Sequence, residues 1–119
     1  MGYYAGGSMG GPESSNVAIG YQAMQDTESA ANNNVAIGRE AMEVVERPNN
    51  VAIGYKAGET LGHGENNIII GANSAASSTT ADNEITLGDT NITKFRIPGI
   101  GVTFKDNGGT PTQGHVLTV

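Results

Sequence analysis

One short motif recurs through most of the chain and limits what this sequence can fold into. The segment NVAIG occurs at 16–20, 34–38 and 50–54, and NIIIG and EITLG follow at 67–71 and 84–88. Successive copies begin 18, 16, 17 and 17 residues apart. A period of this length with alternating apolar residues is typical of a β-solenoid or β-roll. The sequence therefore predicts an all-β chain: a parallel β-roll of about five repeats of 16–18 residues across residues 1–93.

The amino-acid composition agrees with a repetitive fold and disfavours several classes of protein. Ile, Leu, Val and Phe account for 23 of 119 residues, whereas Gly accounts for 18 and Cys and Trp are absent. So few bulky residues cannot build an ordinary enzyme core, but stacked coils can share their apolar surface. The net charge is −6 and there is no basic stripe, so we expect no nucleic-acid partner. No apolar run reaches the length of a membrane span, so we expect no membrane partner.

Within each motif the apolar residues alternate between the two faces of a strand. Val17 and Ile19 share one face, and Ala18 lies on the other. We expect the larger side chains to form columns inside the roll, and the alanines to form an outer column that contacts another subunit. The predicted inner positions are Val17, Ile19, Val35, Ile37, Val51, Ile53, Ile68, Ile70, Ile85 and Leu87. The predicted subunit contact consists of Ala18, Ala36 and Ala52.

The residues that flank each strand suggest turn chemistry. A glycine at one fixed point of every coil predicts a turn that needs positive φ or a close backbone approach. An asparagine before the strand is typical of a turn stabilised by its own side chain, and stacked asparagines can form a hydrogen-bonded ladder. The glycines are Gly20, Gly38, Gly54, Gly71 and Gly88, and the asparagines are Asn16, Asn34, Asn50 and Asn67. Ala23, Ala41, Ala57 and Ser74 mark a second small inward position.

The repeat pattern stops before residue 94. Phe95 and Ile97 alternate there with Lys94 and Arg96, and turn signals follow at 98–99 and 106–109. We therefore expect residues 94–119 to form a β-rich cap or neck, because the last coil of a solenoid exposes open edges. The final strand pattern stops with the chain, so we also expect this cap to be truncated.

The repeats resemble those of a known family. The segments NVAIGYQA, NVAIGREA and NVAIGYKA resemble the head repeats of YadA-like trimeric autotransporter adhesins, and they are similar to tandem repeats of phage tail-fibre and virion-fibre proteins. The resemblance covers roughly residues 1–90. It implies a left-handed parallel β-roll, three chains joined around one axis into a stiff rod, and no catalysis. The family's repeats are often shorter than those of this chain.

The resemblance also implies a role in attachment. The segment ITLGDTNITKFRIPGIGVTF is similar to sequence that follows such repeats in phage fibres, which favours a phage over a bacterium as the source. The expected function is a structural segment of a phage tail fibre or other virion fibre. Its expected partners are two further copies of the chain, other virion or fibre proteins, and a host glycan or receptor. The alternatives are an adhesin head on a bacterial surface and a glycan-degrading tailspike.

Few residues suggest chemistry of their own, and each has a structural alternative. His63 and His115 could ligate a metal or be solvated loop residues, and Glu40, Glu43 and Glu46 fit a solvated face. Asp82, Glu84 and Asp89 could bind Ca²⁺, but the repeat of calcium-binding β-rolls is missing. Tyr3, Tyr21 and Tyr55 could stack on glycans or pack between coils. We predict no catalytic residue, no metal site and no cofactor.

Overall fold

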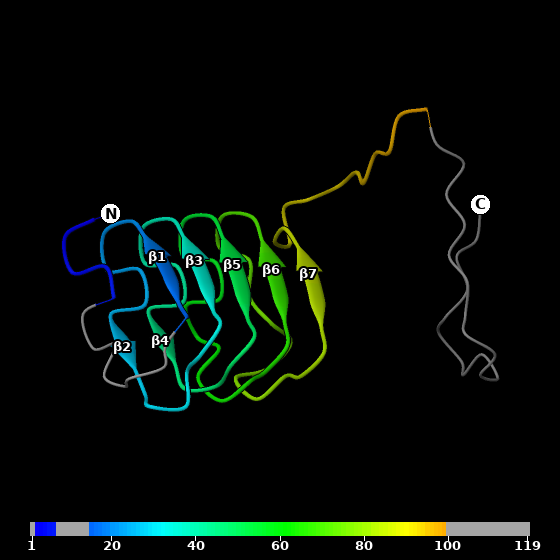
Figure 1. Ribbon diagram of the computed structural model, residues 1–119. Helices are drawn as coiled ribbons and strands as arrows, with labels where there is room; N and C mark the ends of the chain where they lie inside the picture. The colour runs from blue at the N-terminus through cyan, green and yellow to red at the C-terminus, as the bar shows by residue number, and fades with distance from the viewer. Residues whose placement is uncertain (1, 7–14, 100–119) are drawn as a thin grey trace, which may run out of the picture.

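The computed structural model describes residues 2–6 and 15–99, and within these ranges the chain is all-β without a helix. The main sheet has five parallel strands in the order β1-β3-β5-β6-β7, and a second parallel sheet pairs β2 with β4 (Figure 1). The main strands are β1 (Val17–Ile19), β3 (Val35–Ile37), β5 (Val51–Ile53), β6 (Ile68–Ile70) and β7 (Ile85–Leu87). The second sheet contains β2 (Asp26–Thr27) and β4 (Val44–Val45).

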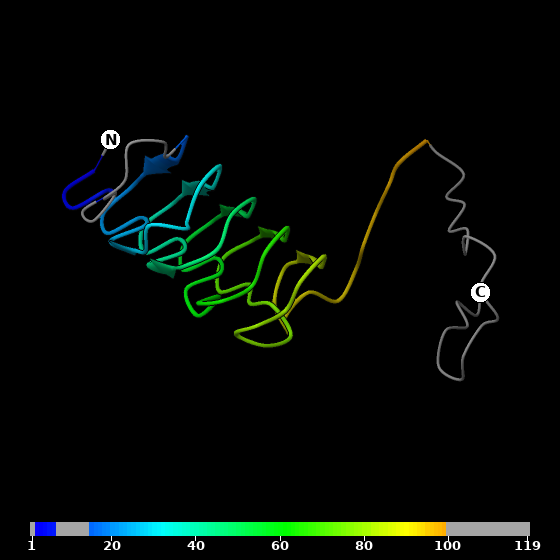
Figure 2. The same ribbon diagram turned by 60° about the horizontal axis from the view of Figure 1, so that its bottom comes forward.

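Each copy of the motif pairs in register with the next copy. Val17 lies opposite Val35, which lies opposite Val51, and the column continues through Ile68 and Ile85. These four pairings correspond to four successive turns of the chain, which stack along one direction (Figure 2). The predicted parallel β-solenoid is therefore confirmed. Residues 2–6 form part of a preceding rung, because Gly6 donates its N–H to Ala23 and Tyr3 accepts one from Gln22.

The two faces of each strand are oriented opposite to the sequence prediction: the face predicted to lie outside points into the coil, and the face predicted to lie inside is on the surface. Ala36 and Ala52, at the strand centres, are completely buried inside the coils, and Ile69 is 1% exposed. The predicted inner Val and Ile side chains instead lie on the outer surface of the main sheet. The coil interior is narrow, because the opposite turn brings buried Met24 and Met42 toward the strands, which leaves room for little more than a methyl group. Ala18, Ala36 and Ala52 belong to this interior, so the prediction that they contact another subunit was wrong.

Two columns inside the solenoid compensate for each other in volume. The strand-centre column changes from alanine at Ala36 and Ala52 to Ile69. The facing column changes in the opposite sense, from Met24 and Met42 to Gly58. A Cβ placed on Gly58 would lie 3.2 Å from Ile69 Cδ1 and 3.4 Å from both Ala52 Cβ and Met42 Cγ. The large and small residues therefore fill one continuous core at nearly constant volume.

This compensation makes the effects of substitutions at 58 and 69 depend on each other. We expect Ile69→Ala to destabilise the chain by about 3 kcal/mol, because it leaves a cavity in a core that collapses poorly. Gly58→Met alone overfills the same space, whereas Gly58→Met in the Ile69→Ala background restores much of the lost stability. Met42, at the equivalent position of the preceding coil, has a positive φ of 45°. The backbone conformation at position 58, with a φ of 63°, is therefore one that methionine can adopt. Denaturant unfolding of the wild type, the two single variants and the double variant measures this coupling. An equal loss of unfolding free energy from Gly58→Met in the wild-type and Ile69→Ala backgrounds would contradict it.

The asparagines that precede the strands form the expected ladder, here called the inner ladder. The backbone N–H groups of Asn34, Asn50 and Asn67 each donate to the side-chain oxygen of the asparagine one coil earlier, at 2.7–3.0 Å. The ladder ends at Glu84, whose N–H donates to Asn67 Oδ1 at 2.9 Å. The Glu84 carboxylate accepts bonds from Ser77 and Thr86 in its own coil, and the bonds from Ser77 and then Thr86 lower its pKa. Glu84 therefore closes the ladder without extending it.

Beyond β7 the chain leaves the solenoid (Figure 1). Residues 94–99 are exposed and form no strand, so the alternation of Phe95 and Ile97 with Lys94 and Arg96 does not produce β-structure in this part of the expected cap. The remainder of the predicted cap, including His115, lies outside the described residues.

Candidate functional site

The outer surface of the main sheet, here called the sheet face, is entirely apolar. Its two columns are Val17, Val35, Val51, Ile68 and Ile85, and Ile19, Ile37, Ile53, Ile70 and Leu87. Seven of these ten side chains are 38–68% exposed, and Val35, Ile37 and Val51 are half-buried. The in-register pairing makes the columns continuous, so the exposed apolar area is on the order of several hundred Å². Monomeric proteins rarely leave a patch of this size and uniformity in water, so the sheet face is the candidate binding surface of this chain.

An aromatic column borders the sheet face on the side where the strands end. It consists of Tyr3, Tyr21, Arg39 and Tyr55, one residue per rung. The rings of Tyr3 and Tyr21 stack with centroids 6.2 Å apart. The Arg39 guanidinium lies between two rings, 5.5 Å from the centroid of Tyr21 and 5.9 Å from that of Tyr55. Both faces of Tyr21 are therefore covered within the chain, which favours the packing role considered for these tyrosines over a platform for sugar rings.

An ion-pair network holds the aromatic column in place. Glu40 bridges two coils, because its carboxylate contacts Arg39 Nε at 2.7 Å and Lys56 Nζ at 3.1 Å. Lys56 also contacts Glu59 at 2.7 Å. The hydrogen bonds from Lys56 and Arg39 lower the pKa of Glu40, and those to Glu59 and Glu40 raise the pKa of Lys56. The Glu40 side chain is only 10% exposed, so the sequence prediction of a freely solvated position was wrong there.

A second polar column borders the sheet face on the side where the strands begin. This outer asparagine column consists of Ser15, Asn33, Asn49, Asn66 and Asn83, all exposed. Its four asparagines have positive φ values of 58–65°, a conformation that asparagine tolerates better than most residues. The residues predicted from the sequence do not include this column, although a doublet of asparagines recurs before the strands.

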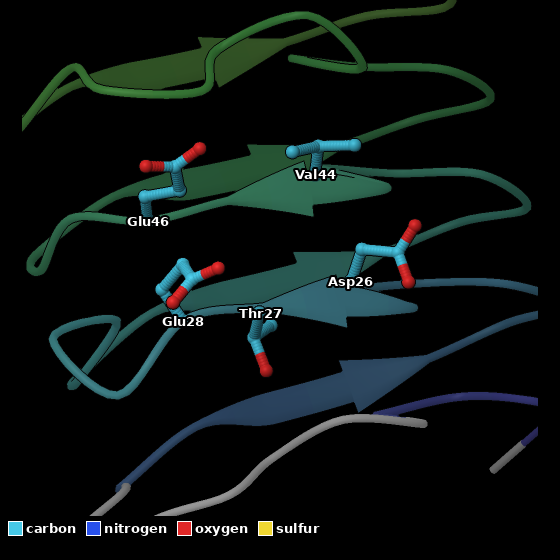
Figure 3. A pocket seen from close by; sticks show the side chains of 5 residues that line it. All are labelled: Asp26, Thr27, Glu28, Val44 and Glu46. Atoms are coloured by element: carbon cyan, nitrogen blue, oxygen red, sulfur yellow. The ribbon is translucent and has the colours of Figure 1, made fainter.

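A shallow depression of about 250 Å³ lies on the second sheet, away from these columns. Asp26, Thr27, Glu28, Val44 and Glu46 line it. Figure 3 shows Asp26 beside Val44, and Glu28 beside Glu46, on the two neighbouring rungs. Three carboxylates therefore share one open surface, which gives it a negative potential.

The remaining candidate ligands do not form a metal site within the described residues. Three or more His, Asp or Glu side chains nowhere come together there in a group that could hold a metal ion. His63 contacts a single carboxylate, that of Glu46, with Nδ1 and Oε2 2.8 Å apart. Asp82 accepts a hydrogen bond from the backbone N–H of Glu65. Asp89 accepts hydrogen bonds from the backbone and the side chain of Asn91, and these bonds, the backbone one most, lower the pKa of Asp89. These side chains have local structural roles.

In the ranges that the structure describes, no helix is long and apolar enough to cross a bilayer. The chain was also compared with models of protein families, with curated proteins and with solved structures, and none of the three comparisons finds a match.

Proposed function

We propose that this chain is a structural segment of a fibre in which three copies associate through their sheet faces into a stiff rod. The rod belongs to a phage tail fibre or other virion fibre and holds a host-binding part away from the particle. Its partners are the two other copies, neighbouring fibre proteins and, through the fibre, a host glycan or receptor. The chain's contribution is mechanical and involves no catalysis.

The exposed sheet face is the observation that carries this proposal. Ten apolar side chains in two straight columns leave water only if another apolar surface covers them. An identical sheet face offers such a surface with the same rung spacing along its whole length. Covering the face adds apolar burial that a chain so poor in bulky residues lacks on its own. The resemblance to YadA-like head repeats supports three copies in parallel around one axis.

The mass of the chain in solution, measured by size exclusion with light scattering, tests the proposal. We expect a mass of three chains that stays constant over a hundredfold dilution. Ile53→Asp adds a charge to the sheet face, and we expect it to yield a monomer whose circular dichroism still shows β-structure, because Ile53 is 38% exposed in the single chain. Thr60→Asp adds the same charge at an exposed turn position and serves as the matched control.

Two results would overturn the trimeric fibre. One is a folded wild-type monomer, and the other is Ile53→Asp with the mass of three chains. For the location, antibodies against the chain should label fibres on virions, whereas labelling of bacterial cell surfaces would favour the adhesin alternative.

The carboxylate-lined depression is the one observation that favours a glycan-degrading enzyme. A glycosidase needs one carboxyl group with a raised pKa, which usually requires an apolar and water-poor surrounding. Asp26 and Glu28 are exposed instead, and Glu46 contacts His63, so we rank this alternative second. Release of sugars from host polysaccharide by the purified chain would reverse this order.

A further inference from the structure

The two borders of the sheet face differ in chemistry. At the strand ends, the aromatic column offers phenol hydroxyls and a guanidinium. At the strand starts, the outer asparagine column offers side-chain amides. Both columns follow the rungs, so Asn49 and Tyr55 lie on either side of the same strand, β5.

In a closed ring of three parallel chains, each contact joins two different borders of the sheet face. In a three-fold ring each chain uses one edge to contact the next chain and the opposite edge to contact the previous one. If the sheet faces surround the axis, the edge where the strands end in one chain meets the edge where the strands begin in the next. Cyclic symmetry involves no shift along the axis, so the rungs that meet are equivalent ones.

We propose that in the assembled fibre the aromatic column of each chain packs against the outer asparagine column of the next chain, with Arg39 and Tyr55 donating hydrogen bonds to asparagine carboxamides. This inference rests on the proposed trimer and specifies its lateral contact. The partner is a second copy of this chain, recognised by aromatic and guanidinium groups on one side and amides on the other.

The unused hydrogen-bonding capacity of the two columns supports this pairing. Arg39 donates through Nε to Glu40, and its two terminal amino groups have no hydrogen-bond partner among the described residues. The side chains of Asn33 and Asn49 likewise find no hydrogen-bond partner within the described part of the chain, although each could donate and accept. Asn33 and Asn49 have similar positive φ values, so their Cα–Cβ bonds leave the backbone in the same way on neighbouring rungs.

The contact is limited to the N-terminal rungs. The position held by Tyr21, Arg39 and Tyr55 is occupied by Ala72 beside β6. Ala72 provides neither a ring nor a donor, so the β6 rung depends on the sheet face alone, and Asp89 beside β7 likewise has neither. The network of Glu40 with Arg39 and Lys56 lies on the last two rungs of the aromatic column and restrains the Arg39 side chain there.

Disulfide trapping tests the inference directly, because the natural chain has no cysteine. We would introduce Tyr55→Cys together with Asn49→Cys, oxidise the protein mildly and separate it on a denaturing gel. The two positions are six residues apart across an extended strand, roughly 15 Å or more, so a bond within one chain is excluded. Tyr55→Cys with Ser15→Cys is the matched control, because Ser15 lies two rungs away, about 10 Å along the stack. Each single variant is a second control.

We expect covalent dimers and trimers, and nothing larger, from the Tyr55→Cys/Asn49→Cys variant, with no cross-link from the controls. Cross-linking of a single variant would place identical edges together and overturn the inference. A wild-type mass of three chains without cross-linking of the double variant would also overturn it, while leaving the proposed trimer standing. A wild-type monomer would instead overturn the proposed function itself, so the two failures are distinguishable.

Discussion

Gly38→Ala is expected to destabilise the solenoid by roughly 3–6 kcal/mol, enough to unfold a marginally stable chain. A Cβ at this position would lie 2.4 Å from the carbonyl oxygen and 2.6 Å from the carbonyl carbon of Gly54 in the next coil. Both atoms belong to the backbone, so relief requires the coils to move apart and their hydrogen bonds to break. Gly38 also has a φ of 136°, which an L-residue rarely adopts. Thermal unfolding at fixed protein concentration gives the change in midpoint.

Gly62→Ala is the matched control for this prediction. A Cβ on Gly62 would meet no atom within 4 Å, and Gly62 is not among the glycines with positive φ. We expect a change between zero and about 1 kcal/mol of added stability, because alanine reduces the freedom of the unfolded chain. Equal losses in the two variants would show that the contact between Gly38 and Gly54 does not set the spacing of the coils.

Asn50→Ala is expected to cost about 3–5 kcal/mol, because it interrupts the inner ladder in its buried middle. Asn50 Oδ1 accepts the backbone N–H of Asn67 at 3.0 Å, and its Nδ2 donates to the carbonyls of Gly64 and Arg47 at 2.9 and 3.2 Å. Alanine would leave that N–H group and the Gly64 carbonyl without a partner in a site that is sealed from water. Urea unfolding would show a lower midpoint with a similar slope.

The control for Asn50 is Asn73→Gly. Asn73 is exposed, has a φ of 57° and uses only its backbone in the hydrogen bond to Tyr55, so glycine retains both the bond and the conformation. We expect a change within about 0.5 kcal/mol. A similar loss from both substitutions would mean that the ladder contributes no more than any asparagine in a turn.

These two sites explain why much of the fold was predictable from the sequence. The period of the motif, the parallel register and the positions of the turns depend on local backbone requirements that recur in every coil. Gly38 lacks a side chain, and Asn50 has an amide that bonds nearby backbone groups. Each therefore suits one particular backbone geometry. Their recurrence at fixed spacing therefore predicts both the turn and the stacking of equivalent turns.

The candidate site was less predictable, because its parts depend on contacts between coils. The carboxylate-lined depression combines Asp26 and Glu28 with Glu46 from linking segments. The 18-residue step between the first two motifs aligns Glu28 with Glu46, but it does not show that these side chains and Asp26 share one open surface. The ion pairs of Glu40 join adjacent coils through a side chain that the repeat pattern leaves variable. Only the distances between the rungs show which of these residues meet.

The sequence by itself determined which residues share a face, since alternation along a strand is a local property. It did not determine which face points inward. Hydrophobicity favoured the Val and Ile columns for the interior, but the tertiary structure placed Ala36, Ala52 and Ile69 there. The physical reason is the width of the coil: Met24 and Met42 already fill the space opposite the strands, so the strand centres accept only small residues until Gly58 makes room for Ile69.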